Sequence, residues 1–401
     1  MLLSVLVASA VGGTASASAA TAVNAAVTAA PVTAVKASLP VKVTVNGKAV
    51  DFGVGLYVDH GKAYVEYGAL FKALGYESEI DEASNAVRAR TEDALVVLQG
   101  EQAFANGTLY PSAGETIEHN GSVVVGVRFA AKLTSFGVEW DAKTKTIALT
   151  YQGPTAEQKA AVYDVFNKLQ LLEAAADSTG LVALISEDSK LDLEQVKKMW
   201  DTAKTKTVYE AKYLESYSDT AATVTLIEKT TKVSGGFYPD NRSETRYTLH
   251  KAKDGSWKIY NIEVTYVEYT NVPDLFKQTA DIPDVEKAAI GGAFENQIKA
   301  FNAKDADAYI ATLFNVADKA GLKASLTSLF QNGSLQATAG QWAVVEYDGS
   351  SKATLLAIVI TESDIGGQKQ KLRQTVLNEA VKTNGQWLLN AETTVLAEEE
   401  L

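Results

Sequence analysis

The strongest constraint on this chain is that its sequence repeats internally, at two different periods. The segment from Gly61, GKAYVEYGALFKALGYESEIDEASNAVRAR, resembles the segment from Gly121, GSVVVGVRFAAKLTSFGVEWDAKTKTIALT, sixty positions later. A second repeat has a period close to 130 residues. Trp257 corresponds to Trp387 in it, and we expect both tryptophans to be core anchors. Repetition of this kind indicates duplicated structural units. The 401 residues therefore divide into three folded domains, in keeping with about 150 residues per domain.

Each copy of the sixty-residue repeat has the pattern of a strand, a short apolar helix and a closing strand after an Asp turn. Asn-Gly pairs, which favour two-residue hairpin turns, begin at Asn46, Asn106 and Asn120. We predict one β-rich domain over residues 40–151.

The ending Gly-Val-Glu-Trp-Asp-Ala-Lys-Thr-Lys-Thr-Ile (residues 137–147), with the repeat, resembles the copper amine oxidase N-terminal-like, or stalk, domain of exported proteins from Gram-positive bacteria. A copper amine oxidase uses three His ligands and a Tyr-derived quinone, whose Tyr commonly follows Asn. This chain has only His60, His119 and His250, and no Asn-Tyr dipeptide. The first two precede repeat glycines, where we expect solvated turns. We predict no metal and no cofactor; a metal-binding pair of His60 and His119 is the alternative.

The longer period predicts two related domains, over residues 154–270 and 284–397. In each, helices precede a run of long strands, so we expect an α+β fold in which a curved antiparallel sheet wraps the helices. Thr155 with Gln158 has the spacing of a capping box, where the first helix should begin. The segment Ala300 to Ala311 and the terminal Asn-Gly-Gln-Trp-Leu-Leu resemble the cone-shaped fold of nuclear transport factor 2 and ketosteroid isomerase. The fold class is α+β: a β-rich stalk domain followed by two tandem cones.

Enzymes of that superfamily place an acid–base pair in the cone. Asp177 and Asp305 are the acids best placed by register, but both precede an apolar helical run, where we expect helix N-caps. We expect His250 to face solvent on a strand, and the second cone has no His. We therefore predict no catalytic residue. The alternative is a cofactor-free lyase or isomerase that pairs an acid with a Tyr.

A tyrosine-rich strand suggests a binding face in the first cone. Strict alternation from Val208 places Tyr209, Tyr213 and Tyr217 on one face, where their rings could stack on a sugar or a flat apolar ligand. We predict these three as ligand-binding residues. The alternative is that the rings fill the sheet–helix core or a domain interface.

The N-terminus has most features of a secretory signal. Leu2 to Val11 is a short apolar run, and Ala-x-Ala sites follow at Ala15 and Ala17, so we expect a signal peptide over residues 1–19. No Lys or Arg precedes Lys36, so the positive n-region is lacking and we expect an upstream start. Residues 20–39 are predicted to be an Ala/Thr-rich linker. We expect an extracellular or wall-associated protein with no stable membrane span after signal removal.

Charge and composition limit the classes of partner that this chain can bind. The net charge of −12 and the lack of a basic, aromatic stripe argue against nucleic acid. The absence of Cys removes disulfides and thiolate sites. Anionic lipid or anionic wall polymer would be repelled unless a cation or a local basic patch intervenes. We predict a non-enzymatic protein of a Gram-positive envelope. Its cones would bind a cell-wall component, a small apolar or sugar ligand, or a protein. A structural spacer or homodimerising module is a further alternative.

Overall fold

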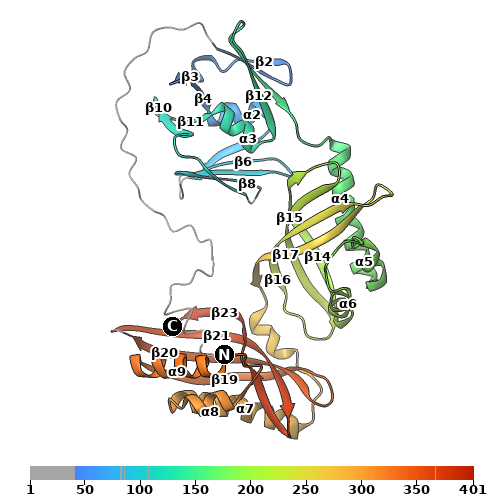
Figure 1. Ribbon diagram of the computed structural model, residues 1–401, viewed down its shortest axis with the longest axis vertical. Coiled ribbons are helices and arrows are strands. Elements are labelled where there is room, and N and C mark those ends of the chain that lie inside the picture. Colours follow the sequence, from blue (N-terminus) through green and yellow to red (C-terminus); the bar gives the residue numbers. More distant parts are fainter. Residues whose placement is uncertain (1–40, 82–83, 85, 107, 366) are drawn as a thin grey trace.

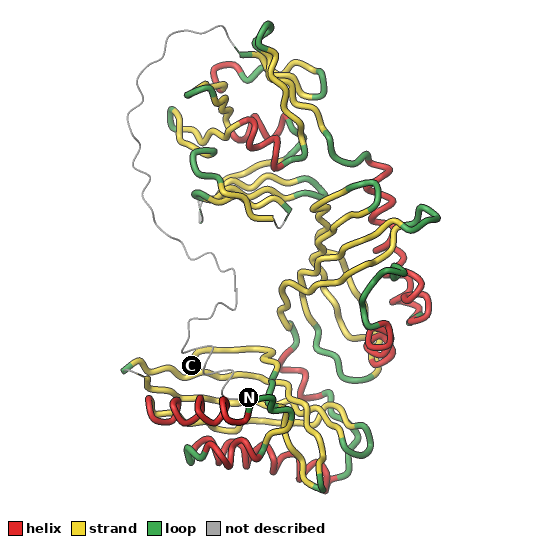
Figure 2. The backbone as a smooth tube through the Cα atoms, viewed as in Figure 1, coloured by secondary structure: helices red, strands yellow, loops and turns green. Residues whose placement is uncertain are grey.

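The computed structural model describes residues 41–401 except 82–83, 85, 107 and 366, so the predicted signal peptide and linker lie outside the described residues. Three folded parts follow one another, coloured blue to teal, green to yellow, and orange to red (Figure 1). Each of the last two places its helices against one face of a sheet (Figure 2). The α+β prediction is confirmed. Among the described residues, no helix is long and apolar enough to cross a membrane.

The stalk domain contains the predicted duplication. Both short helices pack into one apolar core, in which Leu70, Phe71 and Ala130 are fully buried. The first copy consists of β4 (Lys62–Glu66), α2 (Tyr67–Ala73), β5 (Glu77–Asp81) and β6 (Ala86–Arg90). The second copy consists of β11 (Ser122–Gly126), α3 (Val127–Leu133), β12 (Phe136–Asp141) and β13 (Thr146–Tyr151).

Three sheets build this domain, in the strand orders β12-β13-β1-β2, β10-β11-β4-β3 and β5-β6-β7-β8-β9. Asn46 and Asn120, each followed by Gly, have φ angles of 50° and 52°, as hairpin turns with left-handed residues require. The remaining elements are β1 (Lys42–Val45), β2 (Lys48–Val50), η1 (Gly53–Gly55), β3 (Leu56–Asp59), β7 (Leu95–Gln99), β8 (Gln102–Ala105), β9 (Thr108–Pro111) and β10 (Thr116–His119).

The first cone packs three helices against a four-stranded antiparallel sheet of order β14-β15-β16-β17. The capping box of Thr155 and Gln158 is confirmed at the start of the first helix. Asp177 caps the second helix by accepting the Gly180 N–H at 2.8 Å, as predicted. The elements are α4 (Ala156–Ala175), α5 (Ser178–Leu184), α6 (Leu193–Thr202), β14 (Ala203–Tyr217), β15 (Ala221–Gly235), β16 (Asn241–Lys251) and β17 (Trp257–Tyr269).

The second cone repeats this plan and adds two strands. Asp305 caps its second helix by accepting the Ala308 N–H at 2.9 Å, again as predicted. The elements are α7 (Asp284–Asn302), α8 (Ala306–Ala311), β18 (Leu313–Phe314), α9 (Lys319–Asn332), β19 (Gly333–Tyr347), β20 (Lys352–Ile365), β21 (Gln368–Thr383), β22 (Gln386–Asn390) and β23 (Thr394–Glu400). β23 pairs with β21.

Matched aromatic anchors support the duplication of the cones. Trp257 and Trp387 are 6% and 5% exposed, and each packs tilted against a tyrosine 40 residues before it. The ring centroids lie 5.8 Å apart for Tyr217 and Trp257 and 6.4 Å apart for Tyr347 and Trp387. The prediction that both tryptophans are core anchors is confirmed.

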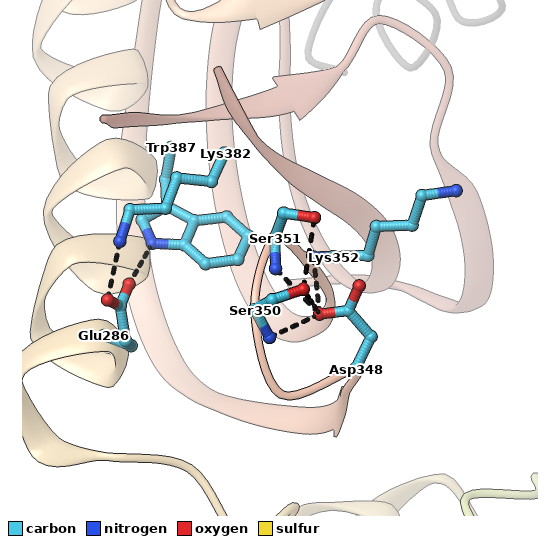
Figure 3. A network of polar contacts seen from close by, with 7 residues as sticks. All are labelled: Glu286, Asp348, Ser350, Ser351, Lys352, Lys382 and Trp387. Carbon is cyan, nitrogen blue, oxygen red and sulfur yellow. Dashed lines mark hydrogen bonds and ion pairs between the residues drawn. The ribbon is translucent and has the colours of Figure 1, made fainter. Parts of the chain in front are cut away.

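Polar contacts hold the second of these anchors in place. Figure 3 shows the Trp387 indole N–H donating to Glu286 at 2.8 Å, while the Lys382 ammonium pairs with the same carboxylate at 2.6 Å. Hydrogen bonds from Lys382 and Trp387 lower the pKa of Glu286. Nearby, Asp348 accepts backbone N–H groups of the following turn, the Lys352 bond foremost, which lowers its pKa to about 2. Glu286 thus ties α7 to the sheet, and Asp348 closes the β19–β20 turn on itself.

The stalk domain meets the first cone at a β-bulge. The Leu214 N–H donates to the Asp93 carbonyl at 3.3 Å, and the Asn106 side chain donates to the Leu214 carbonyl at 3.2 Å. The Lys159 ammonium pairs with the Asp93 carboxylate at 2.6 Å. Backbone groups that β14 leaves free at its register shift after Leu214 are therefore bonded by the stalk domain.

The two cones meet through an apolar cluster. The connecting segment η2 (Val272–Lys277) buries Leu275 completely against the outer face of the second sheet, and Phe237 of the first cone joins it. The Lys232 ammonium and the Tyr238 N–H donate to the Gln278 side-chain oxygen at 2.7 and 3.2 Å. The segment that connects the two cones is thus part of a packed interface.

Candidate functional site

The stalk domain holds a concave groove, the stalk groove, with a volume of about 830 Å³. That size lies within the range of small-molecule sites, roughly 300–1,000 Å³. Val58, on β3 just before the first repeat copy, and Trp140, on β12 of the second copy, are 40% and 43% exposed in it. Apolar side chains form most of its lining: Val41, Val58, Ala63, Pro111, Ala113, Val127, Phe129, Val138, Trp140 and Ile147.

Cations gather at this groove. Residues 41–150 contain ten Lys and Arg and fourteen Asp and Glu, yet the lining includes four cations and one carboxylate. Glu115 pairs with Lys62 at 2.8 Å, and this hydrogen bond raises the pKa of Lys62. Arg128, Lys132 and Lys145 are exposed. The groove is therefore a local basic patch on a chain whose net charge is −12.

A second concavity of about 830 Å³ adjoins the stalk groove at the junction with the first cone. Arg128, Lys132 and Val138 line both hollows, so α3 and β12 form the ridge between them. The second hollow is polar, and its lining includes Gln152 and Gln158. Together the two hollows place a cationic ridge between an apolar and a polar surface.

The three tyrosines predicted to share a face are separated. β14 contains register shifts after Tyr209 and again before Tyr217. Tyr213 pairs with Thr225 and lies among the charges of the outer sheet face, whereas Tyr209 and Tyr217 belong to the helix-facing core. The single-face prediction is wrong, because each bulge inserts a residue that strict alternation does not count.

The two inward tyrosines pack as partly buried core side chains. The Tyr209 ring meets Phe166 edge-on at 6.2 Å between centroids, and its hydroxyl donates to the Phe166 carbonyl at 3.4 Å. Tyr217 packs on Trp257. Burial raises the pKa of Tyr209. This packing favours the core alternative, and ligand binding by these rings stays a prediction.

An acid–tyrosine pair lies buried inside the first cone. The Tyr247 hydroxyl donates to the Glu228 carboxylate at 3.1 Å, and the two residues are 6% and 7% exposed. Burial raises the pKa of Glu228. Glu173 lies in the same cluster and accepts hydrogen bonds from Thr205 and Thr207 at 2.6–2.8 Å. A carboxyl group with a raised pKa beside a hydroxyl can hold or transfer a proton.

The second cone has no counterpart of this pair. The positions 131 residues after Glu228 and Tyr247 are Val359 and Asn378. Val359 is 1% exposed in an apolar core, and the Asn378 amide bonds instead to the loop before β23. This acid–tyrosine pair is therefore not repeated at the matched positions of the second cone.

The three histidines lie in separate environments. His60 occupies a turn with a φ of 47° and a side chain 93% exposed, which confirms its predicted turn position. His119 is not the predicted solvated turn residue: it ends the strand β10 and stacks on Tyr57. His250 lies on β16 in the first cone and pairs with Asp188 at 2.8 Å. In the part of the chain that the structure describes, no three His, Asp or Glu are grouped to hold a metal ion. These residues do not fit a three-histidine copper centre.

The exposed Trp140 and the buried Glu228 were not predicted from the sequence. Trp140 stands between Glu139 and Asp141, and such charged neighbours were a signal that this end of the strand is exposed. Glu228 continues the core-facing series of Val224 and Leu226, so an acid at a core position was the signal for the buried pair. The groove itself has no local signal, because its walls come from distant segments.

Comparison with known proteins assigns the first folded part. Residues 44–155 match the model of the copper amine oxidase N-terminal domain. This match confirms that the sixty-residue repeat of this chain resembles the copper amine oxidase N-terminal-like domain. Residues 170–270, most of the first cone, match the model of the anti-sigma-I factor RsgI9, C-terminal domain. No curated protein matches the chain.

Several solved structures are similar to part of the chain. A ketosteroid isomerase-like protein from Erwinia carotovora atroseptica is 18% identical, with 28% of this chain and 97% of that chain covered and a TM-score of 0.23. The Kfla4162 protein from Kribbella flavida is 18% identical, with 29% and 94% covered and a TM-score of 0.25. A hexachlorocyclohexane dehydrochlorinase from Novosphingobium barchaimii is 13% identical, with 28% and 88% covered and a TM-score of 0.25.

Proposed function

We propose that this chain is an exported, non-enzymatic binding protein of the cell envelope. Its ligand would lie in the stalk groove, and the two cones would form a rigid body that carries the groove. The single observation that carries the proposal is a groove of about 830 Å³ in which Trp140 is 43% exposed. Exposed apolar surface in a concavity is typical of a binding site.

Export is supported by the apolar run from Leu2 and the Ala-x-Ala sites that follow it. A small apolar ligand suits the lining best. A wall component, a sugar or a protein segment would be recognised only by the charged side chains at the rim of the groove.

Replacing Trp140 by Ala tests the proposal. Binding of a neutral apolar probe, 1-decanol, is measured by calorimetry on the full chain. We expect Trp140→Ala to weaken binding about tenfold, because a large aromatic contact is lost. Leu109→Ala is the matched control, since Leu109 is 54% exposed on the same domain but outside the groove. Equal loss in both variants, or no binding by the parent chain, would refute the proposal.

A second candidate function, proton transfer as in a lyase or isomerase, is favoured by the buried pair of Glu228 and Tyr247. Its raised pKa means that Glu228 binds its proton more tightly in the folded chain. The associated stability is full below the unfolded pKa of about 4.3 and is lost as pH rises through the folded pKa.

We therefore expect Glu228→Gln to raise the free energy of unfolding by about 1 kcal/mol at pH 7, because it removes a buried charge and keeps an acceptor for Tyr247. The gain should shrink toward pH 4. Urea denaturation across this pH range measures it, with Glu263→Gln on the exposed sheet face as control. If Glu228→Gln lowers stability at every pH, the carboxylate is a structural acceptor and this second candidate falls.

A further inference from the structure

We propose that the stalk groove binds a single anionic amphiphile, a long-chain carboxylate, with its acyl chain along the apolar lining and its head group at Arg128 and Lys132. This inference rests on the proposed function and names the ligand class of the same site. It combines three features of the groove: a largely apolar lining, a rim with more cations than carboxylates, and a polar hollow beyond it.

The lining selects an acyl chain over a sugar. Around Trp140 the walls are made by aliphatic side chains such as Val58, Val127, Val138 and Ile147. These groups neither donate nor accept hydrogen bonds, whereas a sugar ring loses water from its hydroxyls on binding and needs polar partners in return. An alkyl chain has no such requirement and gains from each CH₂ group that leaves water.

The charges select an anion. Of the four cations in the lining, Lys62 is paired with the one lining carboxylate, Glu115. Arg128 and Lys132 lie one turn apart on α3, and both are exposed. The Lys132 ammonium lies 5.3 Å from the centroid of the Tyr110 ring, which is itself no counter-ion. A carboxylate at the end of an acyl chain supplies the missing negative charge.

The position of the cations orients the ligand. Arg128 and Lys132 stand on the ridge that borders the apolar stalk groove on one side and the polar hollow on the other. The polar hollow is lined by Gln152 and Gln158, whose amide N–H groups can donate to a head group. The carboxylate of Asp219 also lines it, so the head group belongs on the cationic ridge rather than deep in the hollow. An amphiphile matches this order of surfaces from tail to head, whereas a uniformly polar or uniformly apolar ligand does not.

A calorimetric series tests the tail and the head separately. Octanoate, decanoate and dodecanoate are titrated into the full chain at low salt, below their micelle concentrations, beside 1-decanol and decyltrimethylammonium. We expect Kd to fall roughly three- to fourfold for each added CH₂ group. Decanoate should bind more tightly than the alcohol, the cation should bind most weakly, and added salt should reduce the advantage of decanoate.

Paired variants test the cations. Arg128→Gln with Lys132→Gln should weaken decanoate binding about five- to tenfold and 1-decanol binding much less, because exposed charge pairs contribute only modestly each. The matched control is Lys72→Gln, the position of Lys132 in the first copy of the repeat, which lies outside the groove. Circular dichroism confirms that each variant is folded.

The outcomes separate the inference from the function on which it rests. Equal affinity for decanoate and 1-decanol, or tighter binding of a chito-oligosaccharide, would contradict the inference that the ligand is an anionic amphiphile. The groove would then remain a binding site for another class of ligand. No binding of any probe removes both proposals. A dimer that dissociates on Trp140→Ala, seen by light scattering, would place a second copy over the groove and also overturn the inference.

Discussion

Replacing Phe166 by Ala is expected to lower the free energy of unfolding of the first cone by about 3–5 kcal/mol. Phe166 is fully buried on α4, and its ring meets Tyr209 and Tyr247 at centroid distances of 6.2 and 5.1 Å. Its removal leaves a cavity and takes away the edge contacts of both tyrosines. Urea denaturation followed by hydrogen exchange of α4 and the sheet measures the loss.

Leu171→Ala is the control for this prediction, since Leu171 lies on the same helix and is 71% exposed. Its effect should stay within about 0.5 kcal/mol. The stalk groove should bind its probes equally in both variants, because the groove has a separate core. A loss below about 1 kcal/mol for Phe166→Ala would show that the first cone is not held by this aromatic cluster.

Two adjacent glycines of α7 should respond in opposite directions to the same change. A Cβ on Gly291 would lie 2.3 Å from the indole ring of Trp342, so Gly291→Ala forces that ring to move. We expect a cost of about 1–3 kcal/mol from overpacking. A Cβ on Gly292 meets no atom within 4 Å. Gly292→Ala should therefore stabilise the second cone by about 0.5–1 kcal/mol through helix propensity.

Each glycine variant serves as the control for the other, because both gain the same helix propensity. Thermal unfolding measures the sign, and Trp342 fluorescence reports whether its ring is displaced. Stabilisation by both substitutions would mean that the Trp342 ring moves aside at little cost. Destabilisation by both would show that α7 tolerates no Cβ on this side, contrary to the open space at Gly292.

The sequence determined those features that depend on neighbours along the chain. The capping box at Thr155, the caps of Asp177 and Asp305 and the hairpin turn at Asn46 depend on bonds within a few residues, so local patterns predict them. The two repeat periods likewise predicted the stalk duplication and the paired cones. Trp257 and Trp387 were predicted as anchors because both copies place them at the same position.

Tertiary structure alone decided the site. Two bulges in β14 send Tyr213 to the opposite face from Tyr209 and Tyr217, and a bulge depends on the pairing strand rather than on the alternation of one strand. The stalk groove is lined by both Val58 of β3 and Trp140 of β12, which are far apart in the sequence. The sequence therefore determined which units form, through short-range bonds and periodicity. The packing of those units decided where apolar surface and charge stay open to a ligand.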